Sequence, residues 1–223
     1  MGADNGRVLA TQLRSCDQLT HLDLGKNDLG DNGITAISSM LGFCSRIRSL
    51  DLRANFCSPT GATHLAENLS QCVQLEWLCL KFNYIQDAGG EEICSVLHNC
   101  SGLTHLNLAE NELSFTSFDT RPNFLTRTVP GFRNLRELIL SNNSPGEIWE
   151  DNLTPITHAL AGCPSLQRLE FAGLELEGLD WLLPSLRKFT ALTHLDLSDN
   201  LFEDEESLKL AISQVPSLKR VRL

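Results

Sequence analysis

The stretch Leu19-Thr20-His21-Leu22-Asp23-Leu24 recurs, with small changes, along the whole chain. Related stretches begin at Ile47, Leu75, Leu103, Leu135, Leu166, Leu192 and Leu218. The first three intervals are 28 residues each, and the later ones are 32, 31, 26 and 26. Because apolar side chains alternate within each stretch, we predict one short strand per unit with its leucines facing a core. A repeat of this period indicates a solenoid in which each unit packs on its neighbours.

An asparagine follows most of these strands at a fixed distance. It stands eight residues after the start of the stretch in six of the seven units that can be tested, and Leu174 takes its place in the other. An amide side chain can satisfy backbone groups where the chain turns away from a strand, which an apolar side chain cannot do. We therefore expect a row of structural asparagines. Its members are Asn27, Asn55, Asn83, Asn111, Asn143 and Asn200.

Each strand is preceded by two apolar residues spaced four apart, such as Leu9 and Leu13. This spacing marks one face of a helix, so every unit is predicted to run from helix to strand. The clearest helices are expected before the first four strands, where the spacing is regular. Glycines recur ahead of these apolar pairs and are expected in the loops that precede the helices. These glycines are Gly6, Gly33, Gly61, Gly89 and Gly90.

Units of about 28 residues with this strand, this asparagine and a helical return resemble ribonuclease-inhibitor-type leucine-rich repeats, as found in NOD-like receptors and Ran GTPase-activating protein. The resemblance covers essentially the whole chain. It implies an α/β solenoid shaped like a horseshoe, with about eight parallel short strands inside and helices on the convex side. We expect a single leucine-rich-repeat domain over residues 1–223, with irregular longer repeats over residues 112–165.

The composition and the absent motifs argue against several classes of function. The formal net charge of −10 and the pI near 5.0 argue against a general surface for nucleic acid or anionic membranes. The first eight residues lack the features of a secretory signal, and no apolar run approaches the roughly 18 residues of a membrane helix. Neither a phosphate-binding glycine-rich loop, nor a nucleophile elbow, nor a zinc-protease motif is present. We therefore expect no enzyme activity, no cofactor, no small-molecule substrate and no membrane insertion.

The eight cysteines are expected to be reduced and mostly buried. Seven occupy positions that packing residues hold in other units, and the sequence contains no C-x-x-C pair. This pattern favours a cytoplasmic, reducing compartment without disulfides or bound metal. Cys79 alone falls on an outward strand position, so we expect it to react fastest with an alkylating reagent.

Histidines also recur at one outward strand position, in units one, four and seven. Parallel strands lie about 4.8 Å apart, so three units separate these side chains by roughly 15 Å, too far to share a metal ion. We interpret them as surface residues. They are His21, His105 and His194.

The concave face carries the best candidate for a binding site. Most units have small or charged residues at the outward strand positions, but unit three has Trp77 and Phe82. Phe56 and Tyr84 stand at the exposed tenth position of units two and three, with charges of both signs nearby. Aromatic anchors with a polar rim are typical of protein interfaces. The predicted partner-binding residues are Trp77, Phe82, Phe56, Tyr84, Arg53, Lys81, Asp51 and Glu110.

Three functions remain open at this point. The first is an interaction module or adaptor that binds another protein, which could belong to a large complex, through the concave face and its rim. The second is a structural subunit, or a fragment of a larger assembly or longer chain, because the last strand would leave an open edge. The third is a GTPase regulator, which the resemblance to Ran GTPase-activating protein implies by fold alone. The basic last strand, with Arg220 and Arg222, is the alternative binding site.

Overall fold

Eight parallel strands form one open sheet in the computed structural model, which describes residues 2–115, 122–143, 150–178, 180–203, 205–213 and 215–223. The strands follow one another in chain order, and each pairs with the next in register, as Leu22 does with Leu50 and Leu50 with Leu78. They are β1 (His21–Asp23), β2 (Ser49–Asp51), β3 (Trp77–Cys79), β4 (His105–Asn107), β5 (Glu137–Ile139), β6 (Arg168–Glu170), β7 (His194–Asp196) and β8 (Arg220–Arg222).

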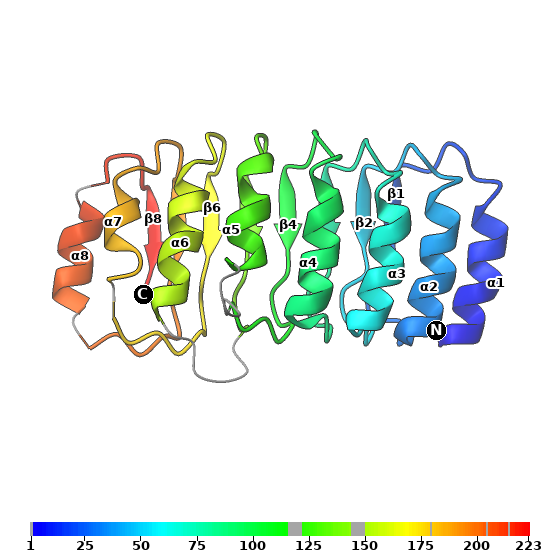
Figure 1. Ribbon diagram of the computed structural model, residues 1–223, viewed down its shortest axis with the longest axis horizontal. Helices are drawn as coiled ribbons and strands as arrows, with labels where there is room; N and C mark the ends of the chain where they lie inside the picture. Colours follow the sequence, from blue (N-terminus) through cyan, green and yellow to red (C-terminus); the bar gives the residue numbers. More distant parts are fainter. Residues whose placement is uncertain (1, 116–121, 144–149, 179, 204, 214) are drawn as a thin grey trace.

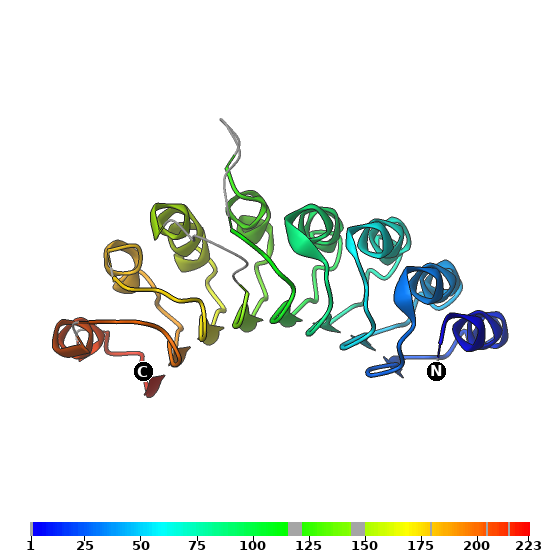
Figure 2. The ribbon, with the colours of Figure 1, turned by 90° about the horizontal axis from the view of Figure 1, so that it is seen from below.

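The helices form a second layer on the convex side of the arc, and the strands line its inner side (Figures 1 and 2). The first four units have helices of 11 or 12 residues, as expected of the regular units, but the helix Glu150–Ala161 of the sixth unit also has 12 residues, so long helices are not confined to the regular units. The helical segments are α1 (Ala3–Leu13), α2 (Gly30–Leu41), α3 (Pro59–Leu69), α4 (Gln86–Leu97), α5 (Phe124–Thr128), η1 (Val129–Gly131), α6 (Glu150–Ala161), α7 (Leu183–Leu186) and α8 (Glu205–Ser213).

The predicted solenoid of eight helix-then-strand units is thus confirmed. The irregular repeats predicted over 112–165 lie partly outside the described residues, because 116–121 and 144–149 are not among them. Within the described part, α5 is short and continues into the 3-10 helix η1. Among the helices that the structure describes, none has the length and apolar character needed to cross a bilayer.

One prediction about the glycines is wrong. They lie in the first turn of each helix rather than in the preceding loop, because successive helices approach closely there. A Cβ atom on Gly61 would lie 2.4 Å from Oδ1 of Asp31 in α2, and one on Gly89 would lie 2.7 Å from Cβ of Ala62 in α3. A side chain at Gly89 would therefore require a shift of α3 itself, whereas one at Gly61 would have to displace the carboxylate of Asp31. The glycines therefore set the spacing between helices.

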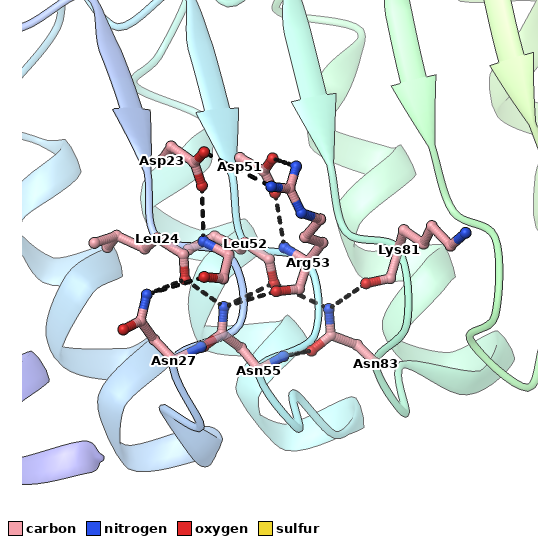
Figure 3. Close-up of polar contacts among 10 residues, drawn as sticks. Asp23, Leu24, Asn27, Asp51, Leu52, Arg53, Asn55, Lys81 and Asn83 are labelled. Atoms are coloured by element: carbon pink, nitrogen blue, oxygen red, sulfur yellow. Dashed lines mark hydrogen bonds and ion pairs between the residues drawn. The ribbon is translucent and has the colours of Figure 1, made fainter. Parts of the chain in front are cut away.

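The asparagine row is a hydrogen-bonded ladder that runs behind the ends of the strands (Figure 3). Nδ2 of Asn55 donates to the carbonyl oxygens of Leu24 and Leu52, at 2.8 and 3.0 Å. Oδ1 of Asn55 accepts from the backbone N–H groups of Asn27 and Leu29, at 3.2 and 3.3 Å. One side chain thus joins two units, and its burial makes each lost bond costly. The structural role predicted for these asparagines is confirmed.

Candidate functional site

Every unit up to the seventh turns away from its strand through a residue in the left-handed backbone region. This residue immediately precedes the asparagine position, where its φ lies between 53° and 62°. Glycine, asparagine and aspartate adopt this conformation most readily, whereas a bulky side chain is uncommon there. The residues are Lys26, Ala54, Phe82, Glu110, Asn142, Gly173 and Asp199. Phe82, with φ 57°, is therefore an unfavourable choice for the backbone alone.

Three aromatic side chains gather at this edge of the solenoid, and we name Phe56, Phe82 and Tyr84 the aromatic rim. Their exposed fractions are 49%, 54% and 44%. Phe56 also has a left-handed backbone, with φ 57°. Its ring stacks on Tyr84 of the next unit, with centroids 6.0 Å apart and planes at 20°. Large aromatic rings that are half exposed keep apolar area in water that a partner could cover.

The aromatic rim borders a hollow of about 220 Å³. Its other walls are polar: Asn83 lies between two of the rings in sequence, and unit four and unit five add two carboxylates and an amide. The added residues are Glu110, Glu112 and Asn142. Glu110 faces Nζ of Lys81 at 2.9 Å, and Glu112 accepts a hydrogen bond from Nε2 of Gln86 at 3.0 Å. The hollow thus combines aromatic faces with negative charge.

The asparagine ladder is interrupted next to this hollow. By analogy with the other rungs, Oδ1 of Asn111 should accept from the backbone N–H of Asn83. That N–H donates instead to the carbonyl oxygen of Glu110, at 3.0 Å, and the next turn places Gln86 rather than Tyr84 in the left-handed region. Oδ1 of Asn111 is buried and has no hydrogen-bond partner within the described part of the chain. The loop of unit three therefore departs from the repeat where the aromatic rim lies.

Trp77 lies apart from the aromatic rim. It is the first residue of β3, whereas Phe82 follows the other end of that strand. Trp77 is half-buried and borders a second hollow of about 330 Å³, with His105 on one side and Ser49 on the other. Of the residues that the structure describes, none lines both hollows. The structure therefore divides the site predicted from the sequence into two separate surfaces.

Charged side chains on the strands are mostly paired across neighbouring units. Arg53 pairs with Asp51 and reaches Asp23, 3.8 Å away, as Figure 3 shows. Asp51 is only 4% exposed, so its expected place among the exposed charges of the site is wrong. Burial raises the pKa of Asp51, against the lowering effect of hydrogen bonding and charge from Arg53. At the alternative site, Arg222 is held by Asp196 at 3.1 Å.

The exposure expected for Cys79 is also wrong. It lies on the concave side of β3, but only 3% of it is exposed, because the residues beside it in the sheet, Asp51 and Asn107, flank it closely. Burial raises the pKa of its thiol to about 11. Cys16 is instead the exposed cysteine. Its counterpart Cys44 is buried and donates to carbonyl oxygens of the preceding unit.

The described residues also bear on metal binding. No group of three or more histidine, cysteine or acidic side chains there is close enough to hold an ion.

The sequence analysis did not predict Asn83, Glu112 and Asn142 as walls of the hollow. Glu112 could have been found, because it shares the tenth repeat position with Phe56 and Tyr84. Asn142 shares the eighth position with Phe82, but the sequence alone does not bring units three and five together at one hollow.

Comparison with known proteins supports the class of fold described above. A family model described as leucine-rich repeat matches residues 16–38. Together with the eight-strand parallel sheet and the solved structures that resemble the chain, this match shows a leucine-rich-repeat solenoid. No curated protein matches the chain.

Two solved structures illustrate the similarity. An internalin, InlF of Listeria monocytogenes, has a TM-score of 0.61 and 18% identity, and the match covers 98% of this chain and 54% of that one. The leucine-rich-repeat ectodomain of the Arabidopsis receptor kinase HAESA has a TM-score of 0.51 and 26% identity, and the match covers 83% of this chain and 27% of that one. HAESA was solved in complex with an N-terminally extended IDA peptide hormone. This chain thus spans about half of the first protein and about a quarter of the second.

Proposed function

We propose that this chain is a protein-interaction module that binds a partner protein through the aromatic rim and does not catalyse a reaction. One observation carries the proposal: Phe56, Phe82 and Tyr84 are half exposed around one hollow, and two of them occupy left-handed backbone positions. Strained residues persist where the surrounding structure or a function maintains them. Aromatic side chains with apolar area in water are the usual anchors of protein interfaces.

The size and surroundings of the hollow favour a protein segment as the occupant. A hollow of about 220 Å³ is smaller than the roughly 300 to 1,000 Å³ of pockets that enclose whole small ligands. It suits one side chain, while the adjoining concave face offers room for the rest of a partner. The HAESA ectodomain, which has the same fold, was solved with a peptide hormone bound, so a peptide segment can bind a solenoid of this kind. The repeat length supports the ribonuclease-inhibitor-type subclass for this chain.

The proposal also concerns the cellular compartment in which the protein works. Seven of the eight cysteines are buried, and their thiols pack as small hydrophobic groups along the solenoid. Burial raises the pKa of Cys57, Cys72 and Cys94 to about 12, so these thiols stay protonated at neutral pH. We place the protein in a reducing, cytoplasmic environment, where such thiols persist.

The test compares two equally exposed phenylalanines. Phe82 is 54% exposed, and Phe43, which follows α2 and lies under the guanidinium of Arg14 at 5.2 Å, is 55% exposed. The wild-type chain, Phe82→Asn combined with Tyr84→Ser, and Phe43→Ala are each immobilised and exposed to native extract. We expect the wild type and Phe43→Ala to capture the same proteins, and the rim variant to lose them.

The captured partner then gives a quantitative measure. Truncation of an interface aromatic commonly costs about 2 kcal/mol or more, so calorimetry should show binding to the rim variant weakened by roughly 30-fold or more. Equal affinity for all three folded proteins would contradict the proposal. Loss of binding in Phe43→Ala alone would move the interface to the ends of the helices.

A further inference from the structure

The hollow beside the aromatic rim has the chemistry of a cation site. Two kinds of group surround it: the faces of Phe56, Phe82 and Tyr84, and the carboxylates of Glu110 and Glu112. A ring face is the negative end of an aromatic quadrupole and attracts a cation, as does a carboxylate. Both walls therefore favour the same sign of charge. Of the described residues that line the hollow, none is a lysine or an arginine.

The two carboxylates differ in their interaction partners, and this difference supports a cation site. Glu110 already pairs with Lys81 at 2.9 Å. Glu112 accepts only a neutral amide hydrogen bond, from Gln86, and it takes part in none of the ion pairs found among the described residues. Most charges on the strands, by contrast, are matched by an opposite charge in the same or the next unit. Within the described part of the chain, Glu112 is thus an uncompensated charge at the wall of an aromatic hollow.

The same negative sign extends along the edge of the solenoid. The eighth and tenth repeat positions lie beyond the strands, and because parallel strands end at one edge, these positions form one row. The acidic residues of the row are Asp28, Glu110, Glu112, Glu175 and Asp199, against the one lysine Lys26. The chain as a whole carries a formal charge of −10. A cationic partner is therefore attracted along the edge before it reaches the hollow.

We propose that the hollow receives an arginine side chain from the partner, with the guanidinium stacked on the aromatic rim and hydrogen-bonded to Glu112. This assignment rests on the proposed function, since it specifies what the same surface recognises. Arginine fits better than lysine because its planar guanidinium stacks on rings and presents paired N–H donors to a carboxylate, whereas the ammonium of lysine is a strongly hydrated point charge. Because Phe56 and Tyr84 already stack on each other, at 6.0 Å and 20°, the guanidinium would stack on an outer face of this pair or on Phe82.

The chain offers a built-in reporter for the test. Tyr84 is the only tyrosine among the 223 residues, so protein labelled with 3-fluorotyrosine gives one ¹⁹F resonance, at the hollow itself. The probes are blocked Gly-Arg-Gly, blocked Gly-Lys-Gly, and the peptide in which citrulline replaces arginine with the same shape and no charge. We expect a saturable shift with the arginine peptide, binding weaker by about threefold or more with lysine, and no saturable shift with citrulline. An equal response to arginine and citrulline, or no response to any peptide, would overturn the assignment.

Three variants examine the roles of the charges. Glu112→Gln keeps the shape of the side chain and should weaken binding of the arginine peptide by about tenfold, because charge-assisted hydrogen bonds become neutral ones. Asp28→Asn changes the same repeat position in unit one and should leave binding unchanged. Lys81→Gln releases Glu110 from its ion pair and should strengthen binding severalfold. Weaker binding in Lys81→Gln, or unchanged binding in Glu112→Gln, would show that the hollow does not select cations.

The two proposals fail in different ways. If the rim variant loses its partner protein while the arginine peptide gives no shift, the interaction surface stands and the arginine assignment falls. If the arginine peptide binds as expected while the rim variant keeps its partner, the cation site stands and the proposed interface falls.

Discussion

The backbone N–H of Asn83 donates to the carbonyl oxygen of Glu110 at 3.0 Å and bypasses the side chain of Asn111, its counterpart in the next unit. Both asparagines are buried, and both donate through Nδ2 to carbonyl oxygens of their own and the preceding unit, as in the contact of each with Leu80. They differ in what they accept. Oδ1 of Asn83 accepts from Asn55 and Cys57, at 3.1 and 2.9 Å, whereas Oδ1 of Asn111 has no partner within the described residues.

This difference predicts unequal costs for the same substitution. Asn83→Ala leaves two buried N–H groups without an acceptor, and Asn111→Ala leaves none. We expect Asn83→Ala to lower the free energy of unfolding by roughly 1 to 3 kcal/mol more than Asn111→Ala does. Urea unfolding followed by circular dichroism measures both values. Equal losses of unfolding free energy in the two variants would show that the interruption of the ladder does not affect stability.

A second prediction separates stability from binding at Phe82. Asparagine tolerates a φ of 57° better than phenylalanine, and a β-branched residue tolerates it worse. Phe82→Asn should therefore unfold within about 1 kcal/mol of the wild type, despite the lost ring contacts, and Phe82→Val should be less stable than Phe82→Asn by about 1 to 2 kcal/mol. Thermal and urea unfolding provide the comparison. A Phe82→Val chain at least as stable as Phe82→Asn would contradict the assigned backbone strain.

The third prediction concerns thiol reactivity. Cys16 is exposed, whereas Cys79 and the remaining cysteines are buried, and burial raises the pKa of the Cys79 thiol to about 11. Since the thiolate is the reactive form, iodoacetamide should modify Cys16 first in the native protein. Mass spectrometry of the early product identifies the site, and Cys16→Ser should remove the fast phase. Early modification of Cys79 would restore the expectation drawn from the sequence.

A fourth prediction contrasts two aspartates at the same strand position. Burial raises the pKa of Asp51. Burial also acts to raise that of Asp196, but hydrogen bonds from Ser198 and Arg222 outweigh it and leave the pKa of Asp196 below its ordinary value. The unfolded value of both is about 3.9. Folding therefore favours the proton on Asp51 and disfavours it on Asp196.

The two shifts act on stability with opposite sign. The contribution of Asp196 is present above about pH 4 and is lost as the pH falls through its lowered folded pKa. The contribution of Asp51 changes in reverse, since stability falls as the pH rises from about 4 through its raised folded pKa. Asp196→Asn should thus cost more stability near neutral pH than near about pH 3, and Asp51→Asn should cost less. Urea unfolding at both pH values is the measurement, and a shared direction would refute the assignment.

The repeat motif correctly predicted the helix and the strand of each of the first four units. Strand residues such as Leu50 are buried in the same way in each of these units, and ladder residues such as Asn55 donate through Nδ2 to the same kind of carbonyl oxygens, so one motif predicts their position and burial. The glycines were placed wrongly because a small residue serves a close helix contact as well as a loop. Only the close approach of neighbouring helices, as of Gly89 to Ala62 in α3, distinguishes these roles, and that approach depends on how two helices pack.

The site was less accessible to sequence reasoning. Trp77 and Phe82 both belong to the outward positions of one strand stretch, but the strand itself ends at Cys79, and the chain then turns. The two aromatic side chains therefore lie at opposite ends of β3. The interruption of the ladder at Asn111 could not be predicted from the sequence, because that residue matches the repeat motif. It arises from the path of residues 83–86, which differs from the equivalent path in unit two.

The left-handed residue before each ladder asparagine has a consequence for how such a protein changes over evolutionary time. Lys26, Ala54, Glu110 and Asp199 share one backbone conformation although their side chains differ in size and charge. Single substitutions at this position can therefore change the surface of the edge while the leucine core and the ladder stay intact. A new side chain can arise in one unit without a change of backbone conformation in that unit or in the others.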